Sequence, residues 1–460
     1  MADFSLTEVL KATGGRLAGT FGGKLFKGVS TDTRTIQPGS LFIALAGERF
    51  DGHEFAAQAA AKGAAGVIVS RPVDVPAGIA VIEVQNTRTA LQDLARFHRQ
   101  RYTIPVVAVT GSNGKTTTKD MVAAVLASRF NVLKTEANFN NEIGLPLTLL
   151  KLAPSHDVAV VEMGMRARGE IQELTKIALP TVGVVTNVGE THLELLGSIE
   201  NIAAAKAELV EAIAQDDLVV LNADDPRVCA MQQKTQGRVV LYGMNKGAFV
   251  WADNIRTGEA GELITEFDCC SPRGSFHVVL PTIGLHNVYN ALAAIAVGWE
   301  LGLKPREIRA GIGLYVPGAM RLEVQKYAKY TVINDVYNAS PLSMAAALSV
   351  LKNIAKGGRQ IAVLGDMLEL GDAAVDAHRR IGRQAAEQGV EIVLTVGELA
   401  KHVAAAAGDH GVKLTYAFSG HTEAIEALQN LLKPGDSILL KGSRGMKMEN
   451  MLAAFKDRSL

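Results

Sequence analysis

From residue 104 onward the chain repeats one pattern: a short run of β-branched or aliphatic residues, a polar or glycine-rich cluster, and then a helical segment. This alternation is typical of strand–helix–strand units in a doubly wound parallel sheet. The apolar runs fall into two sets, 104–109, 158–161, 182–185 and 218–221, and then 330–333, 360–364, 391–395 and 437–440. Two separate sets predict two α/β domains.

The rest of the chain follows other patterns. Residues 237–280 contain shorter alternating segments, such as 274–280, which predict antiparallel strands at the end of the middle domain. The N-terminal part contains an alanine-rich helical stretch over 54–65 and a strand over 66–70, which predict a smaller α/β unit.

Length and composition agree with three domains. The chain has 460 residues, of which 48% are apolar, and a typical domain has roughly 150 residues. We therefore place an N-terminal α/β domain at 1–103, a central doubly wound domain at 104–316 and a C-terminal Rossmann-like α/β domain at 317–460. Pro105 and Pro317 mark the two boundaries.

The charge balance argues against one class of partner. Lys plus Arg and Asp plus Glu both number 47, so the formal net charge is zero. A protein without a global positive field is a poor non-specific binder of nucleic acid, and we expect no nucleic-acid partner. Any anionic ligand must instead be held by local geometry.

The chain shows no pattern of export or membrane insertion. Residues 5–8, SLTE, form a capping box that opens a short helix, where a signal peptide would have a basic and then an apolar region. The longest charge-free stretch, 281–299, contains His286 and two asparagines, which favours a buried helix. The three cysteines include no C-x-x-C pair, so neither a disulfide framework nor a zinc site is indicated. We expect a soluble, cytoplasmic protein.

Residues 106–118, VVAVTGSNGKTTT, combine a strand, a glycine-rich turn and the start of a helix. This arrangement presents backbone N–H groups and a helix dipole to phosphate, which predicts a P-loop-type ATPase domain. Lys115 would reach the β and γ phosphates, and the Thr116 hydroxyl would bind Mg²⁺. Val109 stands where the first glycine of G-x-x-x-x-G-K-[ST] belongs, and an ordinary strand-to-helix turn is the alternative.

Polar residues at neighbouring strand ends should meet this loop, because open α/β sheets bind ligands beyond the carboxyl ends of their strands. Glu162 directly follows the run 158–161 and is a candidate metal ligand; the alternative is a solvated acid at a strand end. His192 lies in the polar segment 187–192 after the next run. Taken alone, it fits a surface or capping histidine equally well.

Lys206 lies on the apolar side of a helix predicted over 199–214. At about 100° per residue, it falls within the stripe formed by Ile202, Leu209 and Ile213. A lysine that points inward must extend to solvent, pair with an acid, lose its proton or be chemically modified. The pattern alone leaves all four open.

These residues and several further motifs together resemble the Mur ligases over essentially the whole chain. The central motifs are TGSNGKT at 110–116, NFNNEIG at 138–144, VEMG at 161–164, NVGETHL at 187–193, AKAE at 205–208 and GLHNVYNA at 284–291. The short phosphate loop, which departs from the Walker A spacing, is what this family expects.

The resemblance implies a nucleotide site with two metal ions. ATP would be contacted by Gly111, Ser112, Asn113, Gly114, Lys115, Thr116, Thr117, Asn287, Arg321 and Asp335. Thr116 and Glu162 would hold one Mg²⁺, and His192 and a carbamylated Lys206 would hold the second. Lys115, His192 and Lys206 are then the catalytic residues. A carbamate would give Lys206 an anionic oxygen, which suits its place on the buried stripe.

Motifs at both ends of the chain narrow the choice within the family. STDTR at 30–34 and ALAGERFDGH at 44–53 resemble a UDP-binding domain, and NDVYNASP at 334–341, LGDMLELG at 364–371 and KGSRG at 441–445 resemble the dipeptide-adding member. The DNPR motif of the diaminopimelate-adding member is absent. The resemblance implies substrate contacts at Ser30, Asp32, Arg34, Asp51, His53, Asn138, Asn141 and Asn338. A simple turn at 51–52 and solvated acids at Asp366 and Glu369 are the alternatives.

The resemblance therefore implies an ATP-dependent amide ligase of peptidoglycan precursor synthesis. It would add D-alanyl-D-alanine to UDP-N-acetylmuramoyl-tripeptide through an acyl phosphate, with the C-terminal domain bringing the dipeptide and closing over ATP. We expect a monomer without other partners. The nearest alternatives are an amino-acid-adding Mur-type ligase and a folylpolyglutamate synthase-like ligase. An alternative from another class is a P-loop switch or motor protein.

Overall fold

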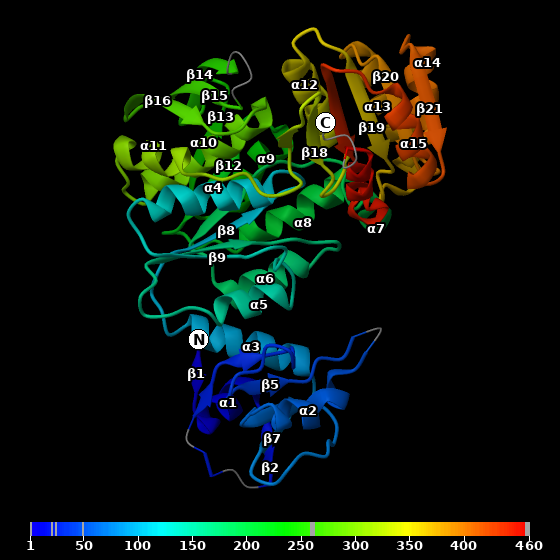
Figure 1. Ribbon diagram of the computed structural model, residues 1–460. Coiled ribbons are helices and arrows are strands. Elements are labelled where there is room, and N and C mark those ends of the chain that lie inside the picture. Colours follow the sequence, from blue (N-terminus) through cyan, green and yellow to red (C-terminus); the bar gives the residue numbers. More distant parts are fainter. Residues whose placement is uncertain (1, 20–21, 24, 48–49, 258–262, 456–460) are drawn as a thin grey trace.

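The computed structural model describes residues 2–19, 22–23, 25–47, 50–257 and 263–455. Figure 1 shows three α/β bodies, coloured blue, then cyan to green, then yellow to red, with the central one between the other two. Their main sheets have five, nine and six strands, so the predicted fold class of three α/β domains is confirmed. No helix within the described ranges is long and apolar enough to cross a membrane.

The N-terminal sheet is the smallest of the three. Its order is β2 (Arg16–Ala18), β7 (Ala80–Glu83), β6 (Gly66–Val69), β5 (Leu41–Ile43) and β4 (Val29–Ser30), while β1 (Asp3–Phe4) pairs with β3 (Phe26–Lys27). The helices are α1 (Leu6–Thr13), α2 (Ala56–Ala61) and α3 (Thr87–Arg99). The helix expected over 54–65 is shorter, because a 3₁₀ turn over Gly52–Phe55 precedes it and the chain turns away at Gly63, where φ is +100°.

The central sheet is parallel except at one edge. Its order is β16 (Gly274–Leu280), β15 (Thr265–Ser271), β14 (Val250–Thr257), β13 (Arg238–Gly243), β12 (Leu218–Asn222), β11 (Val182–Val185), β8 (Val106–Thr110), β10 (Val158–Glu162) and β9 (Val132–Lys134). The antiparallel pairs are β14 with β15 and β15 with β16. They lie in the part of the chain where alternation predicts antiparallel strands.

Helices cover both faces of this sheet, because successive side chains of β8 point to opposite sides. Val107 and Val109 pack with α4 (Lys115–Ala127) and α10 (Leu285–Glu300). The opposite face carries α5 (Gly144–Leu149), α6 (Glu170–Ala178) and α8 (Ile199–Glu211). The strands are therefore buried on both sides, and only their ends are available for a site. The charge-free stretch 281–299 largely becomes the buried helix α10, as predicted.

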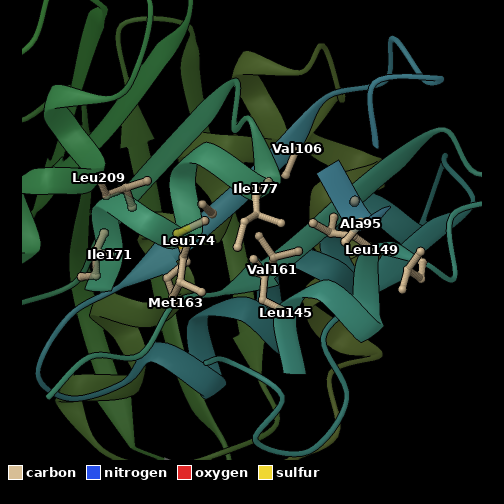
Figure 2. Close-up of a cluster of buried hydrophobic side chains, with 14 of the residues drawn as sticks. Ala95, Val106, Leu145, Leu149, Val161, Met163, Ile171, Leu174, Ile177 and Leu209 are labelled. Carbon is tan, nitrogen blue, oxygen red and sulfur yellow. The ribbon is translucent and has the colours of Figure 1, made fainter. Parts of the chain in front are cut away.

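One apolar core joins the N-terminal and central bodies. Figure 2 shows Ala95 of α3 beside Leu149 of α5 and near Ile177 of α6, and all three side chains are buried. Arg99, also buried at the end of α3, donates a 3.0 Å hydrogen bond from Nε to the carbonyl of Ala178. Each fully buried leucine or isoleucine contributes roughly 1.5–3 kcal/mol, so this core fixes α3 firmly to the central body.

The C-terminal sheet has the order β17 (Glu323–Lys326), β18 (Tyr330–Asp335), β22 (Asp436–Lys441), β19 (Gln360–Gly365), β20 (Ile392–Val396) and β21 (Leu414–Phe418). The expected parallel pattern holds from β18 to β21, but β17 is an antiparallel edge strand that the apolar runs do not reveal. The helices are α12 (Pro341–Ala355), α13 (Ala374–Glu387), α14 (Lys401–Asp409) and α15 (His421–Leu431). The segments that follow β18 and β19 reach the central body, where Ser340 donates to Asn113 and Glu369 contacts His192.

Candidate active site at the carboxyl ends of the central strands

Two glycines shape the loop that follows β8. Gly111 has φ +148° and Gly114 has φ +78°. A Cβ on Gly111 would lie 1.8 Å from Thr186 Oγ1, and a Cβ on Gly114 would lie 2.5 Å from Asn290 Oδ1, so neither position has room for a side chain. Helix α4 begins at Lys115. The backbone N–H groups of its first turn have no acceptor within the helix, which leaves them for an anion.

The segment after β11 holds this loop in shape. The N–H of Ser112 donates to the carbonyl of Asn187 (2.9 Å), and the Ser112 hydroxyl donates to the carbonyl of Gly189 (3.0 Å). The N–H of Asn113 donates to Asn187 Oδ1 at 2.9 Å, and Asn187 Nδ2 donates to the Asn113 carbonyl at 3.0 Å. The loop is therefore fixed by its own protein contacts in a conformation suited to phosphate.

Lys115 folds over the loop from the start of α4. Its Nζ donates to the carbonyls of Gly111 (2.7 Å) and Ser112 (3.2 Å). Burial lowers the pKa of Lys115, the negative charge of Glu162 opposes this shift, and the positive charge of Arg321 adds to it. The ammonium group lies among acceptors that a phosphate oxygen could replace.

Glu162 ends β10 as a buried acid with one free oxygen. Its side chain is 2% exposed, and Oε1 accepts a 2.7 Å hydrogen bond from Asn140 Nδ2. Its Oε2 has no hydrogen-bond partner among the described residues. Asn140 is a site residue that the sequence reasoning missed, although it lies between Asn138 and Asn141 in a segment already singled out.

His192 and Lys206 are close enough for the positive charge of Lys206 to help lower the pKa of His192. His192 has φ +57°, and its Nδ1 lies 2.5 Å from Glu369 Oε2 of the C-terminal domain, an ionic contact without hydrogen-bond geometry. Burial lowers the pKa of His192, and the Glu369 carboxylate opposes this shift. Lys206 is 2% exposed. Burial lowers the pKa of Lys206 well below its usual range, and the charge of Lys115 adds to this effect.

Some of the side chains near these strand ends could bind a hard cation such as Mg²⁺. Within the described ranges, no three His, Cys, Asp or Glu side chains are grouped so that they could hold a metal ion by themselves. The free oxygen of Glu162 and the hydroxyl of Thr116 are the oxygen donors that Mg²⁺ prefers. Mg²⁺ in such sites takes its other ligands from phosphate and water, so the donor set fits an ion that binds together with a nucleotide.

The C-terminal domain reaches the phosphate loop at two points. Arg321 donates from Nη2 to Thr116 Oγ1 at 3.0 Å, and its guanidinium lies 3.8 Å from the ring centroid of Tyr337. Ser340, which caps α12, donates from its hydroxyl to Asn113 Oδ1 at 2.8 Å. The loop is thus contacted by both domains.

Asp335 belongs to a buried ion pair at the end of β18. Its Oδ2 lies 2.6 Å from Lys441 Nζ, and its Oδ1 accepts a 3.0 Å hydrogen bond from the N–H of Leu322. Lys441 also donates to the carbonyl of Asn338 at 2.9 Å. This pair fixes the segments that carry Arg321 and Asn338.

Asn287 connects α10 to α4, the helix that follows the phosphate loop. Its Nδ2 donates to the carbonyl of Ile283 at 2.8 Å, and its Oδ1 accepts from Asn290 Nδ2 at 3.1 Å. Asn290 Oδ1 in turn accepts from the Thr118 hydroxyl at 3.1 Å. Asn290, which also fills the space beside Gly114, is a second residue that the sequence reasoning missed.

A cleft of about 1230 Å³ lies between the domains. It is lined by Ser112, Asn113, Gly114, Lys115, Thr116, Thr117, Asn138, Asn141, Glu162, His192, Asn287, Arg321, Asp335 and Asn338. Segments far apart in the sequence therefore meet in one place, as for Ser340 and Asn113, which are 227 residues apart. Of the candidate site residues in the central and C-terminal domains, Gly111 and Lys206 do not line this cleft.

The five candidate residues of the N-terminal domain do not line the cleft, and they form two separate groups. Asp32 accepts hydrogen bonds from the backbone and guanidinium of Arg34, and its own N–H donates to Ser30 Oγ at 3.2 Å. Asp51 Oδ1 lies 2.5 Å from His53 Nδ1. Hydrogen bonds from His53 hold the pKa of the Asp51 carboxyl well below its usual range. Residues 48–49 of the motif at 44–53 lie outside the described residues.

Comparisons with known proteins agree with these features. Three models match successive parts of the chain: Mur ligase family, catalytic domain (25–99), Mur ligase middle domain (109–298), and Mur ligase, glutamate ligase domain (320–444). A UDP-N-acetylmuramoyl-tripeptide–D-alanyl-D-alanine ligase of Bacillus subtilis is 41% identical over 92% of each chain. The protein belongs to the Mur ligase family.

Solved Mur ligase structures have the same architecture. MurF from Acinetobacter baumannii superposes with a TM-score of 0.91 at 34% identity, covering 99% of each chain. MurF from Thermotoga maritima in complex with ADP gives a TM-score of 0.83 at 27% identity, covering 93% of this chain and 97% of that one. The similarity extends over all three domains of this Mur ligase.

Proposed function

We propose that this Mur ligase joins D-alanyl-D-alanine to UDP-N-acetylmuramoyl-tripeptide in peptidoglycan precursor synthesis, with conversion of ATP to ADP and phosphate. The observation that carries the proposal is the interdomain cleft, where a phosphate loop, a buried acid with a free oxygen and residues of the C-terminal domain come together. The Bacillus subtilis relative bears the name of this activity.

ATP binds along the phosphate loop in this proposal. The backbone from Gly111 to Thr117 surrounds the phosphates, and Asn287 contacts the nucleotide from α10. Arg321 and Asp335 close over it from the C-terminal domain. The contact of Arg321 with Thr116 supports this closure, and so does the ADP named for the Thermotoga maritima relative.

The reaction begins with transfer of the γ-phosphoryl group to the terminal carboxylate of the tripeptide, which forms an acyl phosphate and ADP. This activation is needed because a carboxylate oxygen is a poor leaving group. The amine of D-alanyl-D-alanine then attacks the carbonyl carbon, a C–N bond forms, and the C–O bond to phosphate breaks as the amine loses its proton. Lys115 offsets charge on the transferring group, so catalysis consists mainly of positioning and electrostatic stabilisation.

Two Mg²⁺ ions complete the proposed site. Thr116 and Glu162 hold one ion, and His192 and a carbamylated Lys206 hold the other. When bound, the ions stabilise the charge on the phosphoryl oxygens. The free Glu162 Oε2 supports the first site. The lowered pKa of Lys206 supports the second, because CO₂ reacts with an uncharged amine.

The three domains, placed at 1–103, 104–316 and 317–460, share the substrates in this proposal. The two N-terminal groups bind the UDP end through Ser30, Asp32, Arg34, Asp51 and His53. Asn138, Asn141 and Asn338 contact the peptide where it enters the cleft. The enzyme works as a cytoplasmic monomer.

A phosphate-release assay tests the proposal. Release should require UDP-N-acetylmuramoyl-tripeptide and D-alanyl-D-alanine together, and omission of either should reduce it to background. An amino-acid-adding ligase would release phosphate with a single amino acid, and a folylpolyglutamate synthase-like enzyme would do so with a folate and glutamate. A P-loop switch would hydrolyse ATP without either substrate. Any of these three results would contradict the proposal.

A further inference from the structure

The second substrate of the proposed reaction carries a charge that does not react. The amine of the dipeptide forms the new bond, while its C-terminal carboxylate stays ionised throughout. A carboxylate that moves from water into a cleft needs charged hydrogen-bond donors in compensation. The cleft should therefore hold a cation for this group, within the domain that brings the dipeptide.

Three cations of the cleft are already engaged. Lys115 donates to the carbonyls of the phosphate loop. Arg321 donates to Thr116 and lies on the ring of Tyr337. Lys441 is buried in its ion pair at 2.6 Å with Asp335. Each of these groups serves the nucleotide side of the cleft or the frame around it.

Two further cations of the cleft belong to the other two domains. Arg88 is on α3, with Nη1 4.0 Å from Glu142 Oε1. Arg166 lies between β10 and α6 in the central domain, and its N–H donates to Glu170. Neither residue belongs to the C-terminal domain. Arg88 lies beside Glu142, the neighbour of Asn141, which the proposal assigns to the peptide of the UDP-linked substrate.

Arg444 is the remaining lysine or arginine among the described residues that line the cleft. It lies just after β22, in the short 3₁₀ turn Arg444–Met446, and its side chain is 53% exposed. Its Nη2 lies 2.9 Å from Glu449 Oε1. A guanidinium has five N–H donors in a planar fork, so this ion pair orients the group and still leaves donors for a second carboxylate.

The turn that carries Arg444 lies against the loop after β19. The N–H of Leu368 donates to Ser443 Oγ at 2.9 Å, and a Cβ on Gly445 would lie 3.0 Å from Leu368 Cδ1. Glu369, the next residue on that loop, is in contact with His192. One wall of the cleft therefore continues from Arg444 toward the proposed reaction centre.

We propose that Arg444 binds the C-terminal carboxylate of the incoming dipeptide and selects substrates that carry it, an inference that rests on the proposed function. An extended dipeptide spans roughly 7 Å. With its carboxylate on Arg444, its amine extends along the wall toward His192. Glu449 is a positioning residue, because it orients the guanidinium without touching the substrate.

The test compares D-alanyl-D-alanine with its C-terminal amide in the full-length enzyme and in R444Q. In the unaltered enzyme, KM for the amide should exceed KM for the acid by on the order of fivefold, the upper range for an ion pair at a half-exposed site. R444Q should raise KM for the acid by a similar factor and leave KM for the amide nearly unchanged. R444K keeps the charge and loses the planar fork of donors. Its KM for the acid should lie between the values of the unaltered enzyme and R444Q.

Two controls separate this role from a structural one. K447Q removes one positive charge from an exposed position three residues away and should keep the preference for the acid. KM for ATP and for the UDP-linked tripeptide should stay unchanged in R444Q, which shows that the variant folds. Equal effects of R444Q on acid and amide, or loss of the preference in K447Q, would overturn the assignment of Arg444. Failure of the proposed function is a different result, in which the unaltered enzyme releases no phosphate in response to the dipeptide.

Discussion

Arg321 donates a 3.0 Å hydrogen bond from the C-terminal domain to the hydroxyl of Thr116 on the phosphate loop, 205 residues away in sequence. The face of Tyr337 supports the guanidinium at 3.8 Å from its centroid, an arrangement that stabilises a cation and restricts its orientation. This relationship couples the position of the C-terminal domain to the phosphate loop.

Replacement of Arg321 should weaken nucleotide binding. We expect R321A to raise KM for ATP on the order of tenfold or more, since a hydrogen bond to a charged group contributes about 1.5–3 kcal/mol. R380A is the matched control, because Arg380 also reaches the central domain, where it pairs with Glu190 in a half-exposed ion pair. Such pairs contribute roughly 0–1 kcal/mol, so R380A should change KM for ATP little. If R321A and R380A raised KM for ATP equally in steady-state kinetics, the loss of a contact between the domains would by itself explain the effect.

Replacement of Lys206 tests the carbamate. K206A should be nearly inactive and should regain part of its activity when a short carboxylate such as acetate is supplied in solution. Lys119 provides a control, because it is also buried but donates a 2.8 Å hydrogen bond to the carbonyl of Thr135. K119A should lose stability and gain nothing from acetate. An unmodified Lys206 in the fully active enzyme, seen by mass spectrometry, would contradict the prediction.

The lack of space for a side chain at Gly114 can be tested by comparison with Gly169, a second glycine with a similar backbone conformation. Gly114 and Gly169 both precede a helix, with φ +78° and +87°, but a Cβ on Gly169 meets nothing within 4 Å. Both alanine variants should lose roughly 1–2 kcal/mol of stability from the left-handed backbone. Because a Cβ at 114 would also collide with Asn290, only G114A should lose binding of a fluorescent ATP analogue. Similar analogue affinities for the two variants would count against the clash.

His378 should make the stability of the C-terminal domain depend on pH. This fully buried side chain accepts from the N–H of Met367 on Nε2, and burial lowers its pKa. Below pH about 6.5 the unfolded chain binds a proton that the folded chain excludes. The stabilising contribution is therefore complete above that pH and is lost as pH falls through the lowered pKa.

The pH dependence can be isolated by thermal melting of the unaltered protein and H378N between pH 8 and pH 5. H378N should melt lower at pH 8, because it loses buried hydrogen bonds, and the gap should narrow as the pH falls. H410N, a change at an exposed histidine after α14, should keep a constant gap. A gap for H378N that stays constant with pH would contradict the role of burial.

The sequence predicts those elements whose signals are local. The runs at 158–161 and 182–185 became β10 and β11 almost residue for residue, because strands buried on both faces are continuous apolar segments. Lys206 is buried on α8, whereas its position on the apolar stripe alone leaves extension to solvent open. The antiparallel strand β17 could not be found in this way, since EVQK has no apolar run and its place is set by pairing with β18.

The site could be predicted only as separate pieces. Glu162 and the phosphate loop stand out because each directly follows an apolar strand. The hydrogen bond from Asn140 to Glu162, the contact of His192 with Glu369 and the bond from Ser340 to Asn113 join segments that tertiary packing alone brings together. No periodicity or spacing encodes such contacts, and the roles of the site residues stay predictions.

The apolar core around α3 has a consequence for how the chain folds. Ala95 and its neighbours on α3 precede the proposed boundary at 103, yet they pack against Leu149 and Ile177 of the central domain. Cutting the chain at that boundary would leave a large apolar surface open to water on both fragments. We therefore expect the N-terminal and central domains to unfold together, and a fragment that contains the central domain to need α3 for a closed core.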